Sequence, residues 1–328
     1  MLDKKIVQHT KQRLTCHRQG DHSNIFIFTS ARSGSTWLAE LVGTQPGFKM
    51  VKEPFNIRQQ VVRDHLGINE WEGLFLPENK PLVRSYIQNY IDGKNRDWRL
   101  RTTRFLSKQW KFFTDRIVFK ILFAGEDDIN WFGDQFNGHT IFLIRHPIPV
   151  SLSREVCPRL NSFLQAPYSQ NFTDEQLRYA HQIIQKGDDF EVAILDWCLQ
   201  NVVPLKQARD NWLTISYEQM VLEPETIISS LVEKFSLEAP EKMNKSLYKA
   251  SGSTVKSNSE SQEVLRDSQK IRENRKWLVE KWKSKVAPEQ EKTAQEIMDI
   301  FEVDCYVAAE TRPCSKYWIS SKQPEITE

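Results

Sequence analysis

The sequence predicts an α/β fold in which a central parallel sheet is covered by helices on both faces. Short apolar runs rich in β-branched and aromatic residues recur along the chain, and such runs are typical of strands buried on both sides. Segments with helical spacing separate these runs, which favours parallel strands joined by helical crossovers. The expected strands are Asn24–Thr29, Lys49–Lys52, Arg116–Phe123, Thr140–Ile144 and Trp212–Ser216.

The length and composition fit one large domain with insertions. The chain has 328 residues, of which 39% are hydrophobic, and this is enough to bury a sizeable core. We expect a polar leader over residues 1–23, a single domain over 24–306 and a loosely held tail over 307–328. Insertions at about 56–115, partly helical, and about 155–190, irregular, follow strand ends and therefore shape a substrate pocket.

Charge and cysteine content exclude several classes of protein. The 45 Lys and Arg residues nearly balance the 43 Asp and Glu residues, and the net charge of +2 excludes a general nucleic-acid-binding surface. The amino terminus has no apolar segment of the length of a signal peptide or membrane anchor, so we expect a cytoplasmic protein. The five cysteines lack CxxC spacing, which indicates neither a disulfide framework nor a zinc site.

A loop of small polar residues, Ser30–Thr36, joins the first strand to a helix and has the features of a phosphate site. Its consecutive backbone N–H groups lie at a helix start, where the helix dipole favours an anion. Arg32 adds a planar fork of charged donors suited to phosphate or sulfate oxygens, and Gly34 lets the backbone approach the ligand. The alternative is a serine-rich helix cap without a ligand, but an arginine after a buried strand is costly unless it meets an anion.

This loop differs from the P-loop of kinases. The kinase motif needs a glycine at its start and a lysine before the final hydroxyl residue, and Thr29–Thr36 has neither. A kinase-like phosphotransferase and a non-catalytic nucleotide-binding protein stay open as alternative functions.

Residues Ser30–Trp37 resemble the 5′-phosphosulfate loop of the sulfotransferases that use 3′-phosphoadenosine-5′-phosphosulfate (PAPS). The Arg-Ser-Gly-Ser form is similar to the carbohydrate-modifying and bacterial branches, since the cytosolic branch usually has Lys where Arg32 stands. A second and independent match is Thr140–Ser153, which resembles the family's 3′-phosphate motif. In this motif Arg145 lies at the carboxyl end of a strand and Ser153 lies eight residues later, in the region of the next helix. The guanidinium and the hydroxyl would bind the phosphate from two sides.

The resemblance implies a fold and a nucleotide site. The fold is the sulfotransferase variant of the P-loop NTPase fold. Trp212–Pro224 is similar to the family's strand and turn whose tyrosine borders the adenine, and Ser251–Lys256 loosely resembles the loop that covers the nucleotide. The nucleotide-binding residues implied are Arg32, Ser33, Gly34, Ser35, Thr36, Trp37, Arg145, Ser153, Tyr217, Ser253 and Thr254.

The reaction implied is in-line transfer of a sulfuryl group from PAPS to a hydroxyl or amine, with release of adenosine 3′,5′-bisphosphate (PAP) and without a metal. Cytosolic members use a histidine two residues after a strand lysine, but here Lys120 is followed by Leu122 at that position. The carbohydrate and bacterial branches offer a glutamate in a Glu-Pro setting, which Glu53 resembles. We therefore expect Glu53 to be the general base, with a pKa raised by partial burial, and Arg32 and Lys120 to face the transferring group. The alternative role for Glu53 is a surface ion pair with Lys52.

His146, which follows the strand-end Arg145, is the alternative base. The sequence does not name the acceptor, and a small metabolite, a lipid headgroup or a saccharide fits; the oligomeric state is open as well. We expect Glu126–Asp128 to form a solvated acidic loop. Aromatic residues of the first insertion either stack on the acceptor or fill the core; they are Trp98, Phe105, Trp110, Phe112 and Phe113.

Overall fold

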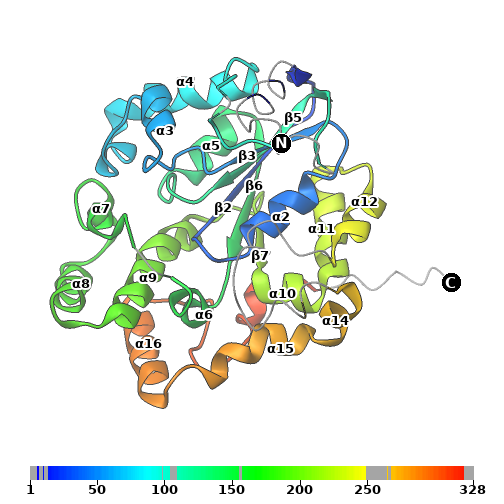
Figure 1. The fold of residues 1–328 in the computed structure, drawn as a ribbon. Coiled ribbons are helices and arrows are strands. Elements are labelled where there is room, and N and C mark those ends of the chain that lie inside the picture. Colours follow the sequence, from blue (N-terminus) through cyan, green and yellow to red (C-terminus); the bar gives the residue numbers. More distant parts are fainter. Residues whose placement is uncertain are drawn as a thin grey trace.

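A five-stranded parallel sheet forms the centre of the protein, and helices cover both of its faces (Figure 1). The computed structural model describes residues 6, 10, 14–97, 99–103, 109–154, 157–248, 264 and 267–320. The strand order is β3-β5-β2-β6-β7, with every neighbouring pair parallel. The strands are β2 (Asn24–Thr29), β3 (Phe48–Lys52), β5 (Arg116–Ile121), β6 (Gly138–Ile144) and β7 (Leu213–Ser216). The predicted fold class and its five strands are confirmed.

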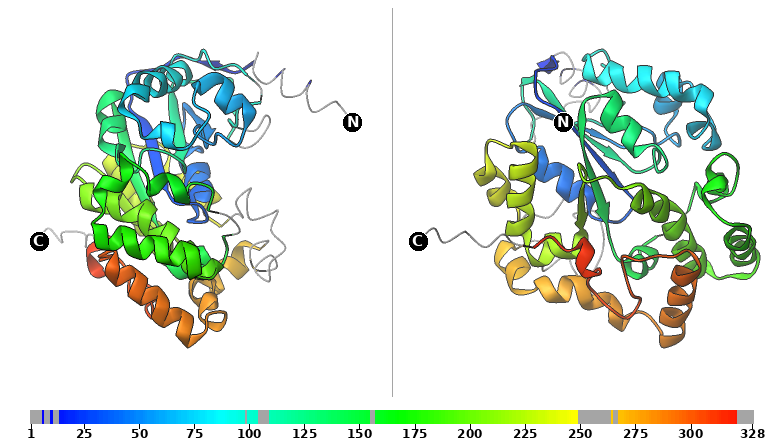
Figure 2. Two further views of the ribbon diagram at one scale, coloured as in Figure 1. Left: turned by 90° about the vertical axis from the view of Figure 1, so that its left-hand side faces the viewer. Right: turned by 180° about the vertical axis from the view of Figure 1, so that it is seen from behind.

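The helices form two layers and a third group at one end. One layer consists of α2 (Ser35–Val42), α11 (Pro224–Phe235) and α12 (Pro240–Ser246). The other consists of α3 (Gln60–Leu66), α4 (Lys80–Ile91), α5 (Ile129–Gln135), α6 (Pro147–Ser151), α7 (Leu160–Phe163), α8 (Asp174–Lys186), α9 (Asp189–Gln207) and α16 (Pro288–Ile300). A smaller cluster joins α10 (Tyr217–Leu222), α14 (Ser268–Glu273) and α15 (Arg275–Glu280). Figure 2 shows α14, α15 and α16 at the end of the molecule opposite to α3 and α4.

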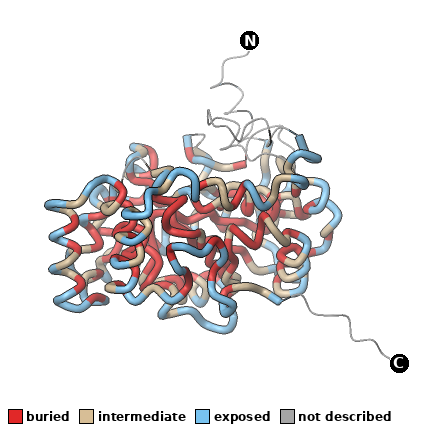
Figure 3. The backbone as a smooth tube through the Cα atoms, turned by 90° about the horizontal axis from the view of Figure 1, so that it is seen from below, coloured by how far each residue is buried: buried red, intermediate tan, exposed pale blue. Residues whose placement is uncertain are grey.

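Alternation along the strands explains why both faces of the sheet are covered. In β2, Ile25 and Ile27 pack on the layer of α2, whereas Phe26 and Phe28 pack on the layer of α4 and α9. Side chains along a strand point to opposite faces in turn, so an uninterrupted apolar run must be buried on both sides. The tube in Figure 3 shows this buried interior enclosed by exposed segments.

Three features differ from the sequence-based expectations. The leader contributes β1 (Cys16–His17), which pairs with β4 (Phe113–Thr114) in a second, two-stranded sheet; strands this short carry no periodic signal. The segment expected to be irregular, about 155–190, contains the well-formed α8. Helix α8 begins with a capping box, a pattern that can be recognised in the sequence. The Thr173 side chain accepts from the Gln176 N–H, and the Gln176 side chain accepts from the Thr173 N–H.

The third difference is the end of the chain. The prediction that the tail is loosely held is wrong up to residue 320. The Gln219 side chain bonds both to the N–H and to the carbonyl of Ile319, and Trp318 Nε1 donates to Glu223 at 3.1 Å. These bonds join segments that are far apart along the chain, so the local sequence pattern could not predict them.

Candidate active site

The candidate site lies where the parallel strands end. In a parallel α/β sheet the carboxyl ends of neighbouring strands meet at one edge, which is where such folds bind ligands. The segments that leave this edge, which we call the carboxyl edge, carry most of the predicted site residues: the loop after β2, Glu53 after β3, Lys120 near the end of β5, Arg145 after β6 and Tyr217 after β7.

The phosphate loop after β2 has an unusual backbone. Arg32 and Gly34 adopt positive φ angles of 70° and 86°, and the hydroxyls of Ser30 and Ser33 lie 2.9 Å apart. In the part of the chain that the structure describes, no side chain caps the start of α2. The first N–H groups of a helix need partners, and an anion supplies them.

Tyr217 and Arg145 enclose this loop. A Cβ atom at Gly34 would lie 2.5 Å from the Tyr217 ring, so only glycine fits there. Arg145 stacks on the same ring, 4.1 Å from its centroid, and its Nη1 donates to the carbonyl of Arg32 at 2.7 Å. The structure therefore brings the two predicted phosphate motifs into direct contact.

The other predicted nucleotide residues lie nearby or outside the described chain. Trp37, on α2, packs against both the α2 layer and the cluster that contains Tyr217. Ser153 follows α6, and its hydroxyl donates to the Val150 carbonyl at 2.9 Å. Ser253 and Thr254 lie outside the described residues.

Glu53 is the centre of an ion-pair network. Lys120 Nζ donates to its Oε1 at 2.9 Å, and Arg101 Nη1 and Asn56 Nδ2 donate to its Oε2 at 2.7 and 3.1 Å. The same Lys120 ammonium donates to Thr36 Oγ1 at 3.2 Å. Lys120 therefore joins the predicted base to the phosphate loop.

Two expectations about Glu53 are corrected. Lys52, its predicted alternative partner, pairs with Glu40 instead. Burial by itself raises the pKa of Glu53, but Lys120 and Arg101 together outweigh burial and lower it. The burial of Glu53 could be predicted from the sequence, but its cationic partners could not, because Arg101 reaches Glu53 from the far end of the first insertion.

His146 lies in a different environment. Its ring is fully buried, with Nδ1 accepting from the Ile148 N–H and Nε2 facing the Val307 carbonyl. It stacks on Trp282 with centroids 4.7 Å apart. Burial lowers the pKa of His146 to about 3, so the ring is neutral and both of its nitrogens face main-chain groups.

The acidic run after β5 is not a solvated loop, which corrects that expectation. Glu126 is buried in a two-bond ion pair with Arg159, with Nη2 2.9 Å from Oε2, and Asp128 pairs with Lys80. Burial, followed by the two acidic neighbours, raises the pKa of Asp127 to about 7. Two of the three carboxylates in this run are therefore neutralised by cationic partners.

Three of the aromatic residues expected in the first insertion are described, of which two are exposed and one forms a hydrogen bond. Phe112 and Phe113 are exposed, and Trp110 Nε1 donates to Thr15; Trp98 and Phe105 lie outside the described residues.

Over the described ranges, no group of three or more potential ligands is arranged to hold a metal ion. Nor does any helix found there have the length and apolar character needed to cross a bilayer.

Comparisons with known proteins agree with the motifs. Residues 192–303 match the family model of the sulfotransferase domain. This range begins within α9 and ends after α16, so it contains Tyr217 but neither the phosphate loop nor Arg145. The match and the two phosphate motifs therefore come from different parts of the chain.

Several solved sulfotransferase structures are similar at low identity. The sulfotransferase domain of the Synechococcus PCC 7002 olefin synthase is 17% identical with a TM-score of 0.41, over 88% of this chain and 99% of that one. A mouse sulfotransferase complexed with PAP is 14% identical with a TM-score of 0.44, over 92% and 90%. The sulfotransferase domain of the curacin biosynthetic pathway is 18% identical with a TM-score of 0.44, over 86% and 98%.

Identities and TM-scores of this size carry no argument about activity, and a search of curated proteins finds no match. The family match to residues 192–303 confirms the resemblance to the sulfotransferases. Over residues 192–303 the chain is therefore similar to the sulfotransferase domain.

Proposed function

We propose that this protein transfers the sulfuryl group of PAPS to a hydroxyl or amine of a small molecule, a lipid or a saccharide. The observation that carries the proposal is the contact between Arg145 and the phosphate loop, with Nη1 2.7 Å from the carbonyl oxygen of Arg32. Because the two predicted anion sites adjoin, one nucleotide with phosphates on both its 3′ and 5′ positions spans them. ATP has no 3′-phosphate for the second site.

Each part of the donor has a proposed partner. The N–H groups at the start of α2 and the Arg32 guanidinium hold the 5′-phosphosulfate. Arg145 and Ser153 hold the 3′-phosphate, and Trp37 and Tyr217 border the adenine. The remaining proposed donor contacts are Ser33, Gly34, Ser35, Thr36, Ser253 and Thr254.

Glu53 is the proposed general base. Its carboxylate takes the proton of the acceptor while the acceptor oxygen or nitrogen forms a bond to sulfur. The bond from sulfur to the phosphate oxygen breaks, and its electron pair leaves on PAP. Lys120 stabilises the charge that develops on that oxygen. His146 is less suited to this role, because both its nitrogens face main-chain groups.

Lys120 also links donor binding to the strength of the base. Its ammonium helps to lower the pKa of Glu53. A sulfonate beside Thr36 attracts that ammonium, which already lies 3.2 Å from Thr36 Oγ1. As the ammonium moves from Glu53 to the donor, the pKa of Glu53 rises, and a carboxylate with a higher pKa is a stronger base.

Calorimetry with PAP, compared with ATP and Mg²⁺, tests the proposed donor without an acceptor. We expect metal-independent binding of PAP that weakens by about tenfold or more in Arg145→Ala, because a charge-assisted contact to phosphate is lost. Arg209→Ala, which removes an exposed surface ion pair with Asp134, is the matched control and keeps the affinity. Tighter binding of ATP with Mg²⁺ would favour the kinase-like alternative.

A further inference from the structure

The main chain at Arg145 is held from two sides by buried side chains. The peptide group between Arg145 and His146 follows directly on the last residue of β6. Its carbonyl accepts from Nε1 of Trp197, on α9, at 3.0 Å. Its N–H donates to Oε1 of Glu218, on α10, at 3.1 Å. Rotation of this peptide, and with it of the Arg145 backbone, would therefore break both hydrogen bonds.

The carboxyl on α10 belongs to the same turn that holds the Arg145 side chain. Ile144 and Ser216 are the last paired residues of β6 and β7, so Arg145 and Tyr217 leave the sheet side by side. The Tyr217 ring lies against the guanidinium, and Glu218 holds the main chain. Two consecutive residues thus fix the two ends of Arg145.

Glu218 is itself held in a fixed orientation. Its carboxyl is buried, and its Oε2 accepts from the Tyr306 hydroxyl at 2.7 Å. Tyr306 is buried as well, and its ring packs on His146 and Trp197 with centroids 5.0 and 6.3 Å apart. The hydroxyl, the carboxyl and the peptide after Arg145 therefore form one hydrogen-bonded chain in the interior.

A carboxyl in this position is costly for the fold. Burial raises the pKa of Glu218, and the bond from Tyr306 and the charge of Arg145 only partly offset this effect. A buried carboxyl lowers stability unless its hydrogen bonds compensate for the lost solvent. An apolar side chain of the same size would fill the space without this cost, which argues that the carboxyl serves Arg145.

We propose that Glu218 is a positioning residue for the 3′-phosphate of the donor. By accepting the His146 N–H it holds the main chain of Arg145 and thereby directs the guanidinium to that phosphate. The proposal rests on the function proposed above, in which Arg145 binds the 3′-phosphate. It adds that Glu218 sets the preference for a nucleotide with a 3′-phosphate without contacting the nucleotide. The alternative is a carboxyl that stabilises the fold and has no specific effect on the donor.

Calorimetry with PAP and with adenosine 5′-monophosphate (AMP) tests this role. The two nucleotides differ only in the 3′-phosphate, so the ratio of their affinities isolates the contribution of that phosphate. Glu218→Met keeps the approximate size of the side chain and removes both acceptor oxygens, whereas Glu218→Gln keeps an oxygen for the His146 N–H. We expect the PAP-to-AMP affinity ratio to fall by about tenfold in Glu218→Met and to stay within about twofold of the wild type in Glu218→Gln.

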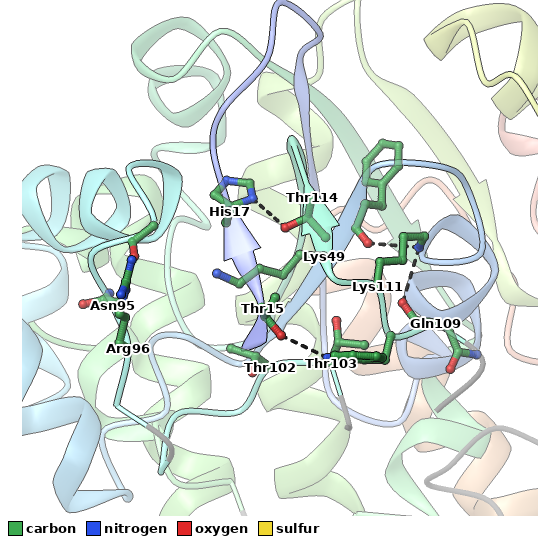
Figure 4. A pocket seen from close by; sticks show the side chains of 13 residues that line it. Thr15, His17, Lys49, Asn95, Arg96, Thr102, Thr103, Gln109, Lys111 and Thr114 are labelled. Carbon is green, nitrogen blue, oxygen red and sulfur yellow. Dashed lines mark hydrogen bonds between the residues drawn. The ribbon is translucent and has the colours of Figure 1, made fainter. Parts of the chain in front are cut away.

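Thr103→Val is the matched control for the loss of a buried acceptor. Thr103 is buried, and its Oγ1 accepts from the Met50 N–H at 2.8 Å, as Glu218 accepts from the His146 N–H. Figure 4 shows Thr103 in a recess beside the start of β3, at the opposite end of that strand from Glu53. This variant should lose stability and keep the affinity ratio of the wild type.

Tyr306→Phe tests the same hydrogen-bonded chain if circular dichroism shows that Glu218→Met does not fold. It removes only the hydroxyl that orients the carboxyl, and the affinity ratio should fall by about three- to fivefold. Tyr168→Phe is its matched control, because it removes a buried hydroxyl that donates to the Leu199 carbonyl at 2.7 Å. We expect this control to leave the ratio unchanged.

Arg145→Ala provides the background that shows through which residue Glu218 acts. In that background Glu218→Met should not lower the affinity ratio further, because the two changes remove the same contribution. An unchanged ratio in folded Glu218→Met, or in Tyr306→Phe where only that variant folds, would overturn this proposal and leave the proposed donor site standing. A wild type that does not prefer PAP to AMP would instead overturn the proposed donor site, and the role of Glu218 with it.

Discussion

Lys120 and Glu53 form a shielded ion pair at the carboxyl edge of the sheet, with Nζ 2.9 Å from Oε1 and side chains that are 6% and 15% exposed. Burying such a pair costs folding free energy, because both charges lose solvent. Removing one partner costs more than replacing both partners by apolar residues. Because Lys120 also donates to Thr36 of the phosphate loop, we propose that these two charges serve the reaction rather than the fold.

The first prediction concerns the carboxylate of Glu53. Glu53→Gln keeps the size of the side chain and removes its ability to accept a proton, so turnover is expected to fall by about 10²- to 10⁴-fold. PAP affinity, measured by calorimetry, should stay within a few-fold. Glu40→Gln, which breaks the neighbouring pair with Lys52, is the matched control and should retain turnover. Wild-type turnover in Glu53→Gln would rule out the proposed base.

The second prediction concerns Arg101, which helps to lower the pKa of Glu53. Removing this charge in Arg101→Ala raises that pKa, so the acidic limb of the pH profile of kcat/KM should move to higher pH. Arg101 is half exposed, and solvent screening limits the shift to a fraction of a pH unit. Arg99→Ala, which removes a pair with Asp97 in the same segment, should leave the limb in place. An unchanged limb in Arg101→Ala would show that Glu53 does not set it.

The third prediction separates backbone strain from crowding in the phosphate loop. Gly34 and Gly67 both have positive φ angles, so an alanine at either position costs about 1–2 kcal/mol in folding free energy. Among the described residues, a Cβ at Gly67 would meet only Leu82, at 3.9 Å, whereas one at Gly34 would meet the Tyr217 ring at 2.5 Å. Denaturant unfolding should therefore show a larger loss for Gly34→Ala, and only this variant should lose PAP binding. Equal losses would contradict the packing of Tyr217 on the loop.

The fourth prediction concerns stability in acid. The pKa of His146 is about 3 in the folded protein, compared with an ordinary 6.5. Between these values the unfolded chain binds a proton that the folded protein does not, so this group lowers the free energy of unfolding as pH falls, by about 1.4 kcal/mol per pH unit. His146→Asn keeps an acceptor for the Ile148 N–H and removes the titration.

Chemical denaturation at pH 6.5 and at pH 5 checks this slope. His146→Asn should lose less stability over this interval than the wild type does, whereas the exposed His181, changed to Asn, should leave the wild-type slope unaltered. A slope in His146→Asn as steep as that of the wild type would show that other groups carry the acid sensitivity.

Much of the sheet and of the phosphate loop could be predicted because their signals are local. The strand over Asn24–Thr29 is a continuous apolar run that ends at small polar residues, and its predicted bounds match β2. The order of the strands then brings Arg145 to the loop, since β2 and β6 are neighbours in the sheet.

The features that could not be predicted depend on contacts between distant segments. Arg101 lies 48 positions from Glu53 along the chain, and no periodic pattern relates the two residues. The direction of the Glu53 pKa shift was predicted wrongly for this reason, because burial was foreseen and two cationic partners were not. Glu126 likewise lies in an acidic run that predicts a solvated loop, but it pairs with Arg159, which is distant along the chain.

A crystal structure with PAP bound tests the central claim most directly. We expect one PAP molecule to span the two motifs, with its 5′-phosphate on the N–H groups at the start of α2 and its 3′-phosphate on Arg145. A PAP molecule bound elsewhere, or with only one of its phosphates at these motifs while the other site stays empty, would contradict it.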